Sequence, residues 1–220
     1  MTNSLRTTQV RTVLARLFAA AAHDDETPGW SKPEVPWESA TAQDRADALE
    51  ATYMPISALG GELLYILVRA QRPNTVVEFG TSYGISTICL AAAVKDNGTG
   101  RVVSTELSMT KISAARANLA EAGLTDRVTI LPGDALETLK DVAGPIEFVF
   151  LDGWKDLCLP VLQSVESRLA RGAMIVADDI KLPSLSDYLE YVRRPDSGYV
   201  SVPFPVEDGM EISCWTAVDH

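Results

Sequence analysis

Histidine and cysteine are scarce in this chain, which has two histidines and three cysteines among 220 residues. His23 and His220 lie far from Cys89, Cys158 and Cys214 in the sequence, so no group of these residues has the spacing of zinc ligands. An odd number of widely separated cysteines also argues against a disulfide framework. We therefore expect reduced thiols, as is usual in a cytoplasm.

Positive charge is also in short supply, because 19 lysines and arginines face 30 aspartates and glutamates and leave a net charge of −11. Such a surface repels the phosphates of nucleic acids and of anionic lipids, so we expect neither nucleic acid nor membrane as a partner. The charge does not identify the substrate, since acidity also promotes solubility.

Long hydrophobic runs are absent, and no stretch approaches the roughly 20 apolar residues that span a bilayer. Near the N-terminus, Arg16 interrupts an apolar run and acidic residues follow at 24–26, which is unlike a signal peptide. We expect an amphipathic helix here and a soluble, cytoplasmic protein. Its apolar face would consist of Val10, Val13, Leu14, Leu17 and Phe18.

The first third of the chain is predicted to be helical with one long loop. Residues 23–40 contain three prolines and read as a loop, whose Trp30 and Trp37 either staple it to the body or cover a pocket. A helix is expected over 41–54 and another before Pro73. The second of these helices presents one apolar face, made of Leu59, Leu63, Ile66, Leu67 and Ala70. We treat 1–52 as an N-terminal segment, either a lid or a contact in a homodimer, and 53–220 as the main domain.

From Thr75 onward, short apolar segments alternate with helical patterns. Repeated strand–helix units predict an α/β fold of the Rossmann-like type, with a mostly parallel seven-stranded sheet and helices on both faces. Ligands of such sheets gather at the carboxyl edge of the strands. The expected strands are 75–79, 101–105, 128–131, 146–151 and 173–177, followed by a terminal pair at 198–202 and 212–218.

The first strand runs into a glycine-containing turn, Glu78-Phe79-Gly80-Thr81-Ser82-Tyr83-Gly84-Ile85-Ser86. Gly80 permits a tight strand-to-helix turn, and Gly84 lets the backbone approach a ligand closely. The N–H groups at the start of the next helix can bind a carboxylate or phosphate. Ser82 stands where a dinucleotide motif has its second glycine, so a pyrophosphate is not indicated.

Acidic residues follow the next two strands. Glu106 ends the second strand, where a carboxylate can accept hydrogen bonds from both ribose hydroxyls. Asp134, before Ala135, either accepts from an exocyclic amino group or caps the following helix, and the two roles are compatible. Together with the glycine turn these residues predict a nucleoside site without a phosphate loop. S-adenosylmethionine, an adenosine that carries an amino acid, fits such a site.

Three aspartates end the fourth and fifth strands. Asp152 follows one apolar strand, and Asp178 and Asp179 follow the next. The two adjacent residues can still converge where the chain leaves the sheet and turns. Three neighbouring carboxylates repel one another unless a cation lies between them. Their hard oxygen ligands suit magnesium or another divalent cation, although a loop opening is the simpler alternative.

The run Leu151-Asp152-Gly153-Trp154-Lys155-Asp156-Leu157-Cys158-Leu159-Pro160 resembles the catalytic segment of the catechol O-methyltransferase family. The resemblance extends from about Tyr53 to the C-terminus. It includes Met54-Pro55-Ile56, the segment from Glu78 to Ser86, Glu106, Asp178-Asp179 before Pro183, and Asp208-Gly209-Met210-Glu211. It implies a class I methyltransferase domain over 53–220 that transfers a methyl group to a hydroxyl of a small molecule.

The resemblance assigns roles to the matching residues. Asp152, Asp178 and Asp179 would bind the metal, and Lys155 would be the general base for the acceptor hydroxyl. Trp154 would contact adenine and form a wall of the acceptor pocket, with Pro183 as a second wall. The expected cofactor contacts are Met54, Ile56, Glu78, Gly80, Ser82, Tyr83, Gly84, Ser86, Glu106, Asp134, Ala135, Asp152 and Trp154.

Three departures from the family pattern concern the metal and the acceptor. Asp179 stands where the animal enzymes have asparagine, and Thr52 replaces an aromatic residue expected before Met54. The family glutamate that grips the second catechol hydroxyl has no clear counterpart, with Glu207 and Glu211 nearby. The acceptor is therefore expected to be a catechol, another phenol or a sugar-type polyhydroxyl.

Other functions would use a similar sheet. A metal-independent or N-directed methyltransferase would keep the cofactor site without needing three aspartates. An NAD-dependent oxidoreductase is disfavoured by Ser82 and by the lack of a Tyr-x-x-x-Lys pair or catalytic histidine. A non-catalytic binding protein would have no use for Lys155, whose simplest alternative role is a surface pair with Asp156.

Overall fold

The computed structural model describes residues 3–26, 36 and 39–216. In these residues seven strands form one sheet in the order β3-β2-β1-β4-β5-β7-β6, parallel except for β7, which runs antiparallel to both neighbours. The strands are β1 (Thr75–Phe79), β2 (Arg101–Glu106), β3 (Val128–Pro132), β4 (Ile146–Leu151), β5 (Leu169–Ala177), β6 (Tyr199–Phe204) and β7 (Met210–Trp215). The predicted α/β class with a mostly parallel seven-stranded sheet is confirmed.

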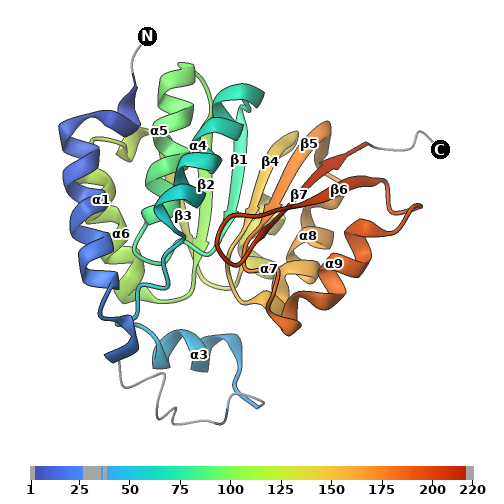
Figure 1. Cartoon of the computed structure of the whole chain (residues 1–220), viewed down its shortest axis with the longest axis horizontal. Coiled ribbons are helices and arrows are strands. Elements are labelled where there is room, and N and C mark those ends of the chain that lie inside the picture. The colour runs from blue at the N-terminus through green and yellow to red at the C-terminus, as the bar shows by residue number, and fades with distance from the viewer. Residues whose placement is uncertain (1–2, 27–35, 37–38, 217–220) are drawn as a thin grey trace.

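Helices cover both faces of this sheet (Figure 1). One face carries α1 (Thr8–Ala21), α4 (Ala58–Gln71), α5 (Ile85–Asn97) and α6 (Met109–Glu121). The other carries α7 (Ala135–Thr138), α8 (Cys158–Glu166) and α9 (Ser186–Arg193). A separate helix, α3 (Ala42–Ala48), lies outside these layers (Figure 1). Each face has its own hydrophobic core, as a buried parallel sheet requires.

The sheet reverses its strand order between β1 and β4. The chain winds from β1 through β2 to β3 in one direction, and then returns to place β4 on the other side of β1. Such a reversal opens a crevice at the carboxyl ends of the two central strands. Gly84, in the left-handed region with φ 91°, starts α5 at the rim of this crevice.

Helix α4 is turned away from its predicted orientation. Its buried positions are Gly60, Gly61, Leu64 and Val68, whereas Leu59 is 68% exposed and Ile66 is 58% exposed. The two glycines explain the difference, because a Cβ atom at Gly61 would lie 2.8 Å from Cys89 Sγ in α5. Close helix packing at the glycines therefore outweighs burial of the larger apolar stripe.

Three predicted boundaries are also corrected. The helix expected over 41–54 ends at Ala48, where Leu49 leaves the helical conformation, and residues 52–57 form an irregular segment that leads into α4. The strand expected over 173–177 begins earlier, at Leu169. The last strand ends at Trp215 rather than Val218, which lies outside the described residues. Trp30 and Trp37 also lie outside the described residues.

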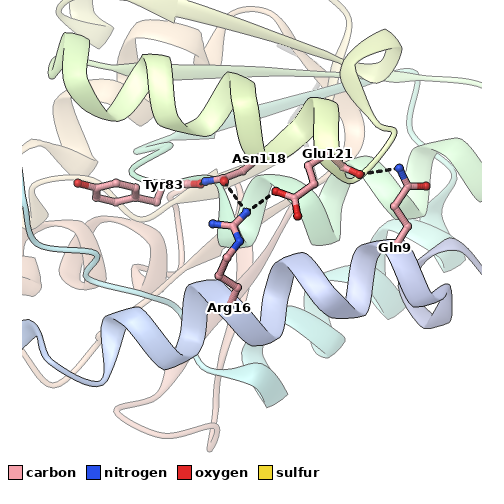
Figure 2. A network of polar contacts seen from close by, with 5 residues as sticks. All are labelled: Gln9, Arg16, Tyr83, Asn118 and Glu121. Carbon is pink, nitrogen blue, oxygen red and sulfur yellow. Dashed lines mark hydrogen bonds and ion pairs between the residues drawn. The ribbon is translucent and has the colours of Figure 1, made fainter.

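Helix α1 is fastened to α6 by a polar network (Figure 2). The guanidinium of Arg16 donates to Asn118 Oδ1 at 3.0 Å and pairs with Glu121. Gln9 Nε2 donates to the backbone carbonyl of Glu121. Asn118 Nδ2 donates to the carbonyl of Tyr83 at 2.9 Å, in the turn between β1 and α5. The N-terminal helix is thus connected to the crevice.

The amphipathic character predicted for α1 is confirmed, since Val10, Val13 and Leu17 are buried in the core it shares with α4, α5 and α6. Within the described ranges, every helix is too short or too polar to cross a membrane.

Candidate active site

A cavity of about 370 Å³ lies at the carboxyl edge of the sheet, where the sequence predicted the ligands to gather. Its wall is formed by residues that follow β1 to β5 and by the segment 53–56 that precedes α4. The predicted site residues that line it are Met54, Ile56, Gly80, Ser82, Tyr83, Ser86, Glu106, Asp134, Ala135, Asp152, Trp154, Lys155, Asp178 and Asp179.

The glycine turn at the end of β1 forms the floor of the cavity. Gly80 has φ 99°, and a Cβ atom there would lie 2.8 Å from the carbonyl oxygen of Asp152. A side chain would therefore separate β1 from the end of β4, which carries the first aspartate. Ser82, also left-handed with φ 45°, donates its backbone N–H to Glu106 Oε2 at 2.8 Å.

Glu106 is held in place by backbone groups. Its Oε1 atom accepts from the N–H groups of Leu107 and Ser108, both at 2.9 Å. The carboxylate lines the cavity with its orientation fixed, as a group that accepts hydroxyl hydrogen bonds requires. Nearby, burial lowers the pKa of Lys111, although Glu106 and Asp24 attract its ammonium group.

Asp134 caps α7 and also lines the cavity. Its Oδ1 atom accepts from the N–H of Leu136 at 2.9 Å, so the capping role expected from the sequence is observed. The carboxylate keeps a second oxygen for a ligand.

Three predicted residues are not in the cavity wall. Glu78 is fully buried beneath it, and Gly84 serves as the residue that starts α5. Pro183 is exposed, and its neighbour Leu182 lines the cavity instead. Glu207 is exposed and Glu211 is buried against Arg193, so neither glutamate reaches this wall.

Glu78 accepts hydrogen bonds from three buried hydroxyl groups. Ser86 donates to its Oε1, and Thr87 and Ser104 donate to its Oε2, each at 2.6 Å. Burial raises the pKa of Glu78 to about 7, the three hydroxyls oppose this rise, and Asp152 adds to it. The residue therefore links β1, β2 and α5 below the cavity floor.

The three aspartates converge. One carboxylate oxygen each of Asp152, Asp178 and Asp179 lies within 4.8 Å of the others. Asp179 has φ 58°, and this left-handed turn lets two successive side chains reach the same point. Burial raises the pKa of Asp178 to about 8, and repulsion from Asp152 and Asp179 adds to the effect. The cluster thus favours a bound positive charge.

Lys155 supplies such a charge. Its Nζ lies 2.7 Å from Asp152 Oδ1 and 3.0 Å from Asp179 Oδ2, and its side chain is only 10% exposed. Burial alone would lower the pKa of Lys155, but the attraction of the two carboxylates is stronger and raises it. Three carboxylate oxygens gathered at one point fit a hard divalent cation.

Asp156 is paired with Arg45 rather than with Lys155. The guanidinium contacts both carboxylate oxygens, at 2.9 and 3.0 Å, and lies 4.9 Å from the centre of the Trp154 ring. Helix α3, which carries Arg45, is thereby held against the turn that carries Lys155. The surface pair between Lys155 and Asp156, considered from the sequence, is not formed.

Sequence reasoning missed several residues at this site. Tyr53 and Lys111 line the cavity, and Asp24 and Arg45 bind segments of its wall. Tyr53 adjoins the Met54-Pro55-Ile56 motif and could have been found from it. The contacts of Asp24 and Arg45 span 29 and 111 positions, so no local pattern reveals them.

Comparisons with known proteins agree with this geometry. A family model described as a methyltransferase domain matches residues 77–180. The catechol O-methyltransferase of Mycobacterium tuberculosis is 38% identical over 142 residues, which cover 64% of this chain and 64% of that protein. The catechol O-methyltransferase of Sus scrofa is 32% identical over 148 residues, covering 64% of this chain and 78% of that protein.

The fold extends the comparison. The cofactor-bound structure of Rv0187 from MTB superposes with a TM-score of 0.71 at 27% identity, covering 93% of this chain and 90% of that one. The aligned region spans less than two thirds of the mycobacterial catechol enzyme. The sequence match to the Sus scrofa enzyme and the shared fold show that this chain belongs to the S-adenosylmethionine-dependent O-methyltransferases related to catechol O-methyltransferase.

Proposed function

We propose that this protein transfers the methyl group of S-adenosylmethionine to a hydroxyl of a small molecule, with the help of a divalent cation. One observation carries the proposal: the residues predicted to bind a nucleoside line the same cavity as three converging carboxylates and a lysine. The two halves would hold the cofactor and the acceptor next to each other.

The cofactor half consists of the glycine turn, Glu106, Asp134 and the wall segment 53–56. Glu106 would accept from the ribose hydroxyls, because its backbone contacts fix it at the end of β2. Asp134 would accept from the adenine amino group with the oxygen that does not cap α7. Ser86, Met54 and Ile56 would lie along the amino-acid end.

The acceptor half consists of the aspartates, Lys155 and an apolar wall. Asp152, Asp178 and Asp179 would hold the cation, which when bound stabilises the negative charge of the acceptor oxygen. Lys155, whose Nζ lies beside Asp152 and Asp179, would take the proton from the acceptor hydroxyl. A bound cation would neutralise the two carboxylates that raise the pKa of Lys155 and would allow the lysine to be deprotonated. The wall would also hold the acceptor in line with the methyl group.

The wall of the acceptor half favours an aromatic acceptor. Trp154, Leu157 and Leu182 line the same cavity as the carboxylates. A flat ring with a hydroxyl on its edge would bury its faces against these side chains, whereas a sugar would leave its hydroxyls against apolar groups. We therefore place a catechol or another phenol ahead of a sugar-type acceptor.

The test is methyl transfer from labelled S-adenosylmethionine to catechols, simple phenols and oligosaccharides, with Mg²⁺ or with EDTA. We expect a labelled phenolic product that disappears in EDTA and returns when excess Mg²⁺ is added. Product that persists in EDTA would instead support the metal-independent alternative. A labelled oligosaccharide product would instead show that the acceptor is a sugar-type polyhydroxyl.

A matched pair of variants distinguishes the effect of losing a carboxylate in the cluster from the effect of losing any one carboxylate of this acidic protein. Asp178→Asn should lose Mg²⁺-dependent transfer, whereas Asp187→Asn, an exposed position in α9, should keep it. Equal activity of the two variants would count against the three-aspartate site.

A further inference from the structure

The N-terminal segment reaches the cofactor cavity through one carboxylate. Asp24 follows α1, and its two oxygens accept from two successive backbone N–H groups, those of Tyr53 at 2.8 Å and Met54 at 2.7 Å. Both of these residues line the cavity. A side chain outside the methyltransferase motifs therefore holds part of the cofactor wall.

The backbone that Asp24 binds is strained. Met54 has φ 45°, a left-handed conformation that side chains other than glycine rarely adopt. The surrounding contacts must therefore hold it in place. Ser82 Oγ donates to the carbonyl of Tyr53 at 2.6 Å, and the Tyr53 ring stacks on Tyr83 with 4.0 Å between centroids. Asp24 contributes the only part of this anchorage that comes from before α3 in the described chain.

Asp24 is connected to the body of the protein through α1 and through the floor of the cavity. Helix α1, which precedes it, is bound to α6 by the network of Figure 2, and Asn118 of that network binds the carbonyl of Tyr83. The ammonium of Lys111 lies 5.9 Å from the centre of the Tyr83 ring and is attracted by both Glu106 and Asp24. The carboxylate is therefore coupled to the floor of the cavity as well as to its wall.

We propose that Asp24 is a positioning residue of the cofactor site, which shapes the Tyr53–Met54 wall without touching the cofactor. The inference rests on the proposed cofactor site and assigns to the N-terminal segment a role in cofactor affinity. Without the carboxylate, the two N–H groups lose their acceptors and Met54 relaxes out of its left-handed conformation.

The experiment compares Asp24→Ala, Asp24→Asn and the control Asp25→Ala, an exposed neighbour. Binding of S-adenosylhomocysteine is measured by calorimetry, with circular dichroism to show that each variant is folded. We expect about ten-fold weaker binding for Asp24→Ala, a smaller loss for Asp24→Asn, and wild-type affinity for Asp25→Ala. The KM for S-adenosylmethionine should rise in the same order, while kcat at saturating cofactor stays within about two-fold.

Three results would overturn the inference, and they are distinguishable. If the wild type binds and Asp24→Ala binds equally well, the carboxylate does not position the wall. A loss of kcat with unchanged cofactor KM would likewise contradict a role in affinity. If the wild-type protein itself fails to bind S-adenosylhomocysteine, the proposed cofactor site is wrong, and the role of Asp24 falls with it.

A different observation, the outward stripe of α4, carries a second inference. Leu59 and Ile66 point away from the core, and on the same side of the sheet β6 exposes Val200 at 64%, Val202 at 55% and Phe204 at 40%. Met210 of β7 packs against Gly60, which places the stripe beside this uncovered end of the sheet. We call these five exposed side chains the α4–β6 surface.

The α4–β6 surface is complementary to itself. Within the described residues, the outer side of α4 packs against no strand and the β6 end of the sheet packs against no helix on this side, and β6 carries no charged residue. Five such side chains expose on the order of 500 Å², near the upper limit for monomers and more than half of the roughly 800 Å² per partner of a stable interface. We infer that a second copy of this chain covers it by two-fold symmetry.

The oligomeric state tests this inference. We expect a dimer in sedimentation equilibrium and a monomer for both Ile66→Glu and Val202→Glu, with circular dichroism to confirm folding. Met109→Glu is the control, because Met109 is 64% exposed on α6 and outside the surface. A monomeric wild type, or a dimer that survives both substitutions, would overturn the inference.

Discussion

At the scale of single residues, Glu78 shows that a residue of the glycine-turn motif can connect secondary-structure elements below a cavity instead of lining it. The sequence placed it among the cofactor contacts, because it begins the glycine turn. The structure places it under the cavity, where three hydroxyls donate to it and burial raises its pKa to about 7. Its charge therefore has an energetic cost at neutral pH that an exposed glutamate does not have.

Glu78→Gln should change how stability depends on pH. Because the folded-state pKa lies above the ordinary 4.5, the contribution of Glu78 to stability is fully present below pH 4.5 and is lost as pH rises through about 7. The wild type should lose on the order of 3 kcal/mol over this range that the variant does not lose. Urea unfolding at pH 5 and pH 8 measures the difference. Parallel pH profiles would contradict the expectation.

Lys155→Met should affect turnover more than folding. The substitution keeps the apolar stem and removes the ammonium that lies between Asp152 and Asp179. We expect turnover to fall by about 10²- to 10⁴-fold, with cofactor affinity retained, because the proton acceptor is lost. The unbalanced carboxylates should also make the melting temperature rise more on addition of Mg²⁺ than it does in the wild type. Unchanged turnover would remove Lys155 from the mechanism.

At the scale of elements, α4 shows that packing space can override an apolar stripe. Five large or medium apolar residues recur at helical spacing and predicted the inner face, yet the helix packs through Gly60 and Gly61. Gly61 allows α4 to approach Cys89 of α5, and Gly60 allows it to approach Met210 of β7. A local pattern reports which residues are apolar, whereas the neighbouring helix decides which face can come close.

Gly61→Ala and Cys89→Ala should therefore be coupled. An added methyl group at Gly61 would lie 2.8 Å from Cys89 Sγ, so the single alanine at 61 overpacks and the single alanine at 89 leaves a void. The double variant should be more stable than the sum of the single effects by about 1 kcal/mol or more. Chemical denaturation of the four proteins completes the cycle. Additive effects of the two substitutions on the free energy of unfolding would show that the methyl group at position 61 is accommodated beside Cys89 at no cost.

Arg45 ties helix α3 to the turn that carries Lys155. Arg45→Met should release it, because the paired carboxylate of Asp156 and the Trp154 ring both lose their partner. We expect faster amide hydrogen exchange over residues 42–48 with unchanged exchange in β1 and β4. Arg194→Met, a cation that lies over the Tyr191 ring on the other side of the sheet, is the control. Equal protection of α3 in both variants would exclude the attachment.

At the scale of the whole molecule, net charge and the α4–β6 surface act against each other. A charge of −11 repels a second copy, while the apolar surface attracts it. Salt screens the repulsion and leaves the apolar contact intact. The dimer should therefore become tighter between about 0.05 and 0.5 M NaCl, as measured by sedimentation. Weaker association at high salt would indicate that ion pairs hold the two copies together instead.

The sequence by itself determined the sheet, its edge and most of the side chains that meet there. Apolar segments that alternate with helical patterns predict parallel strands, and parallel strands bring their carboxyl ends together. The sequence therefore places Glu106, Asp134, Asp152 and the Asp178–Asp179 pair at one edge of the sheet. Each of these placements depends only on the strand at whose carboxyl end the residue lies.

Only the tertiary structure decided which elements close the cavity and what holds them. Asp24 binds a wall 29 positions away, and Arg45 reaches Asp156 across 111 positions, so neither contact leaves a periodic trace in the sequence. Packing between elements also decides that Glu78 is buried, which face of α4 points inward, and that Leu182 lines the cavity where Pro183 was predicted. Local patterns fix where a chain is strand or helix, but the space left by neighbouring elements determines which side chains finally face the ligand.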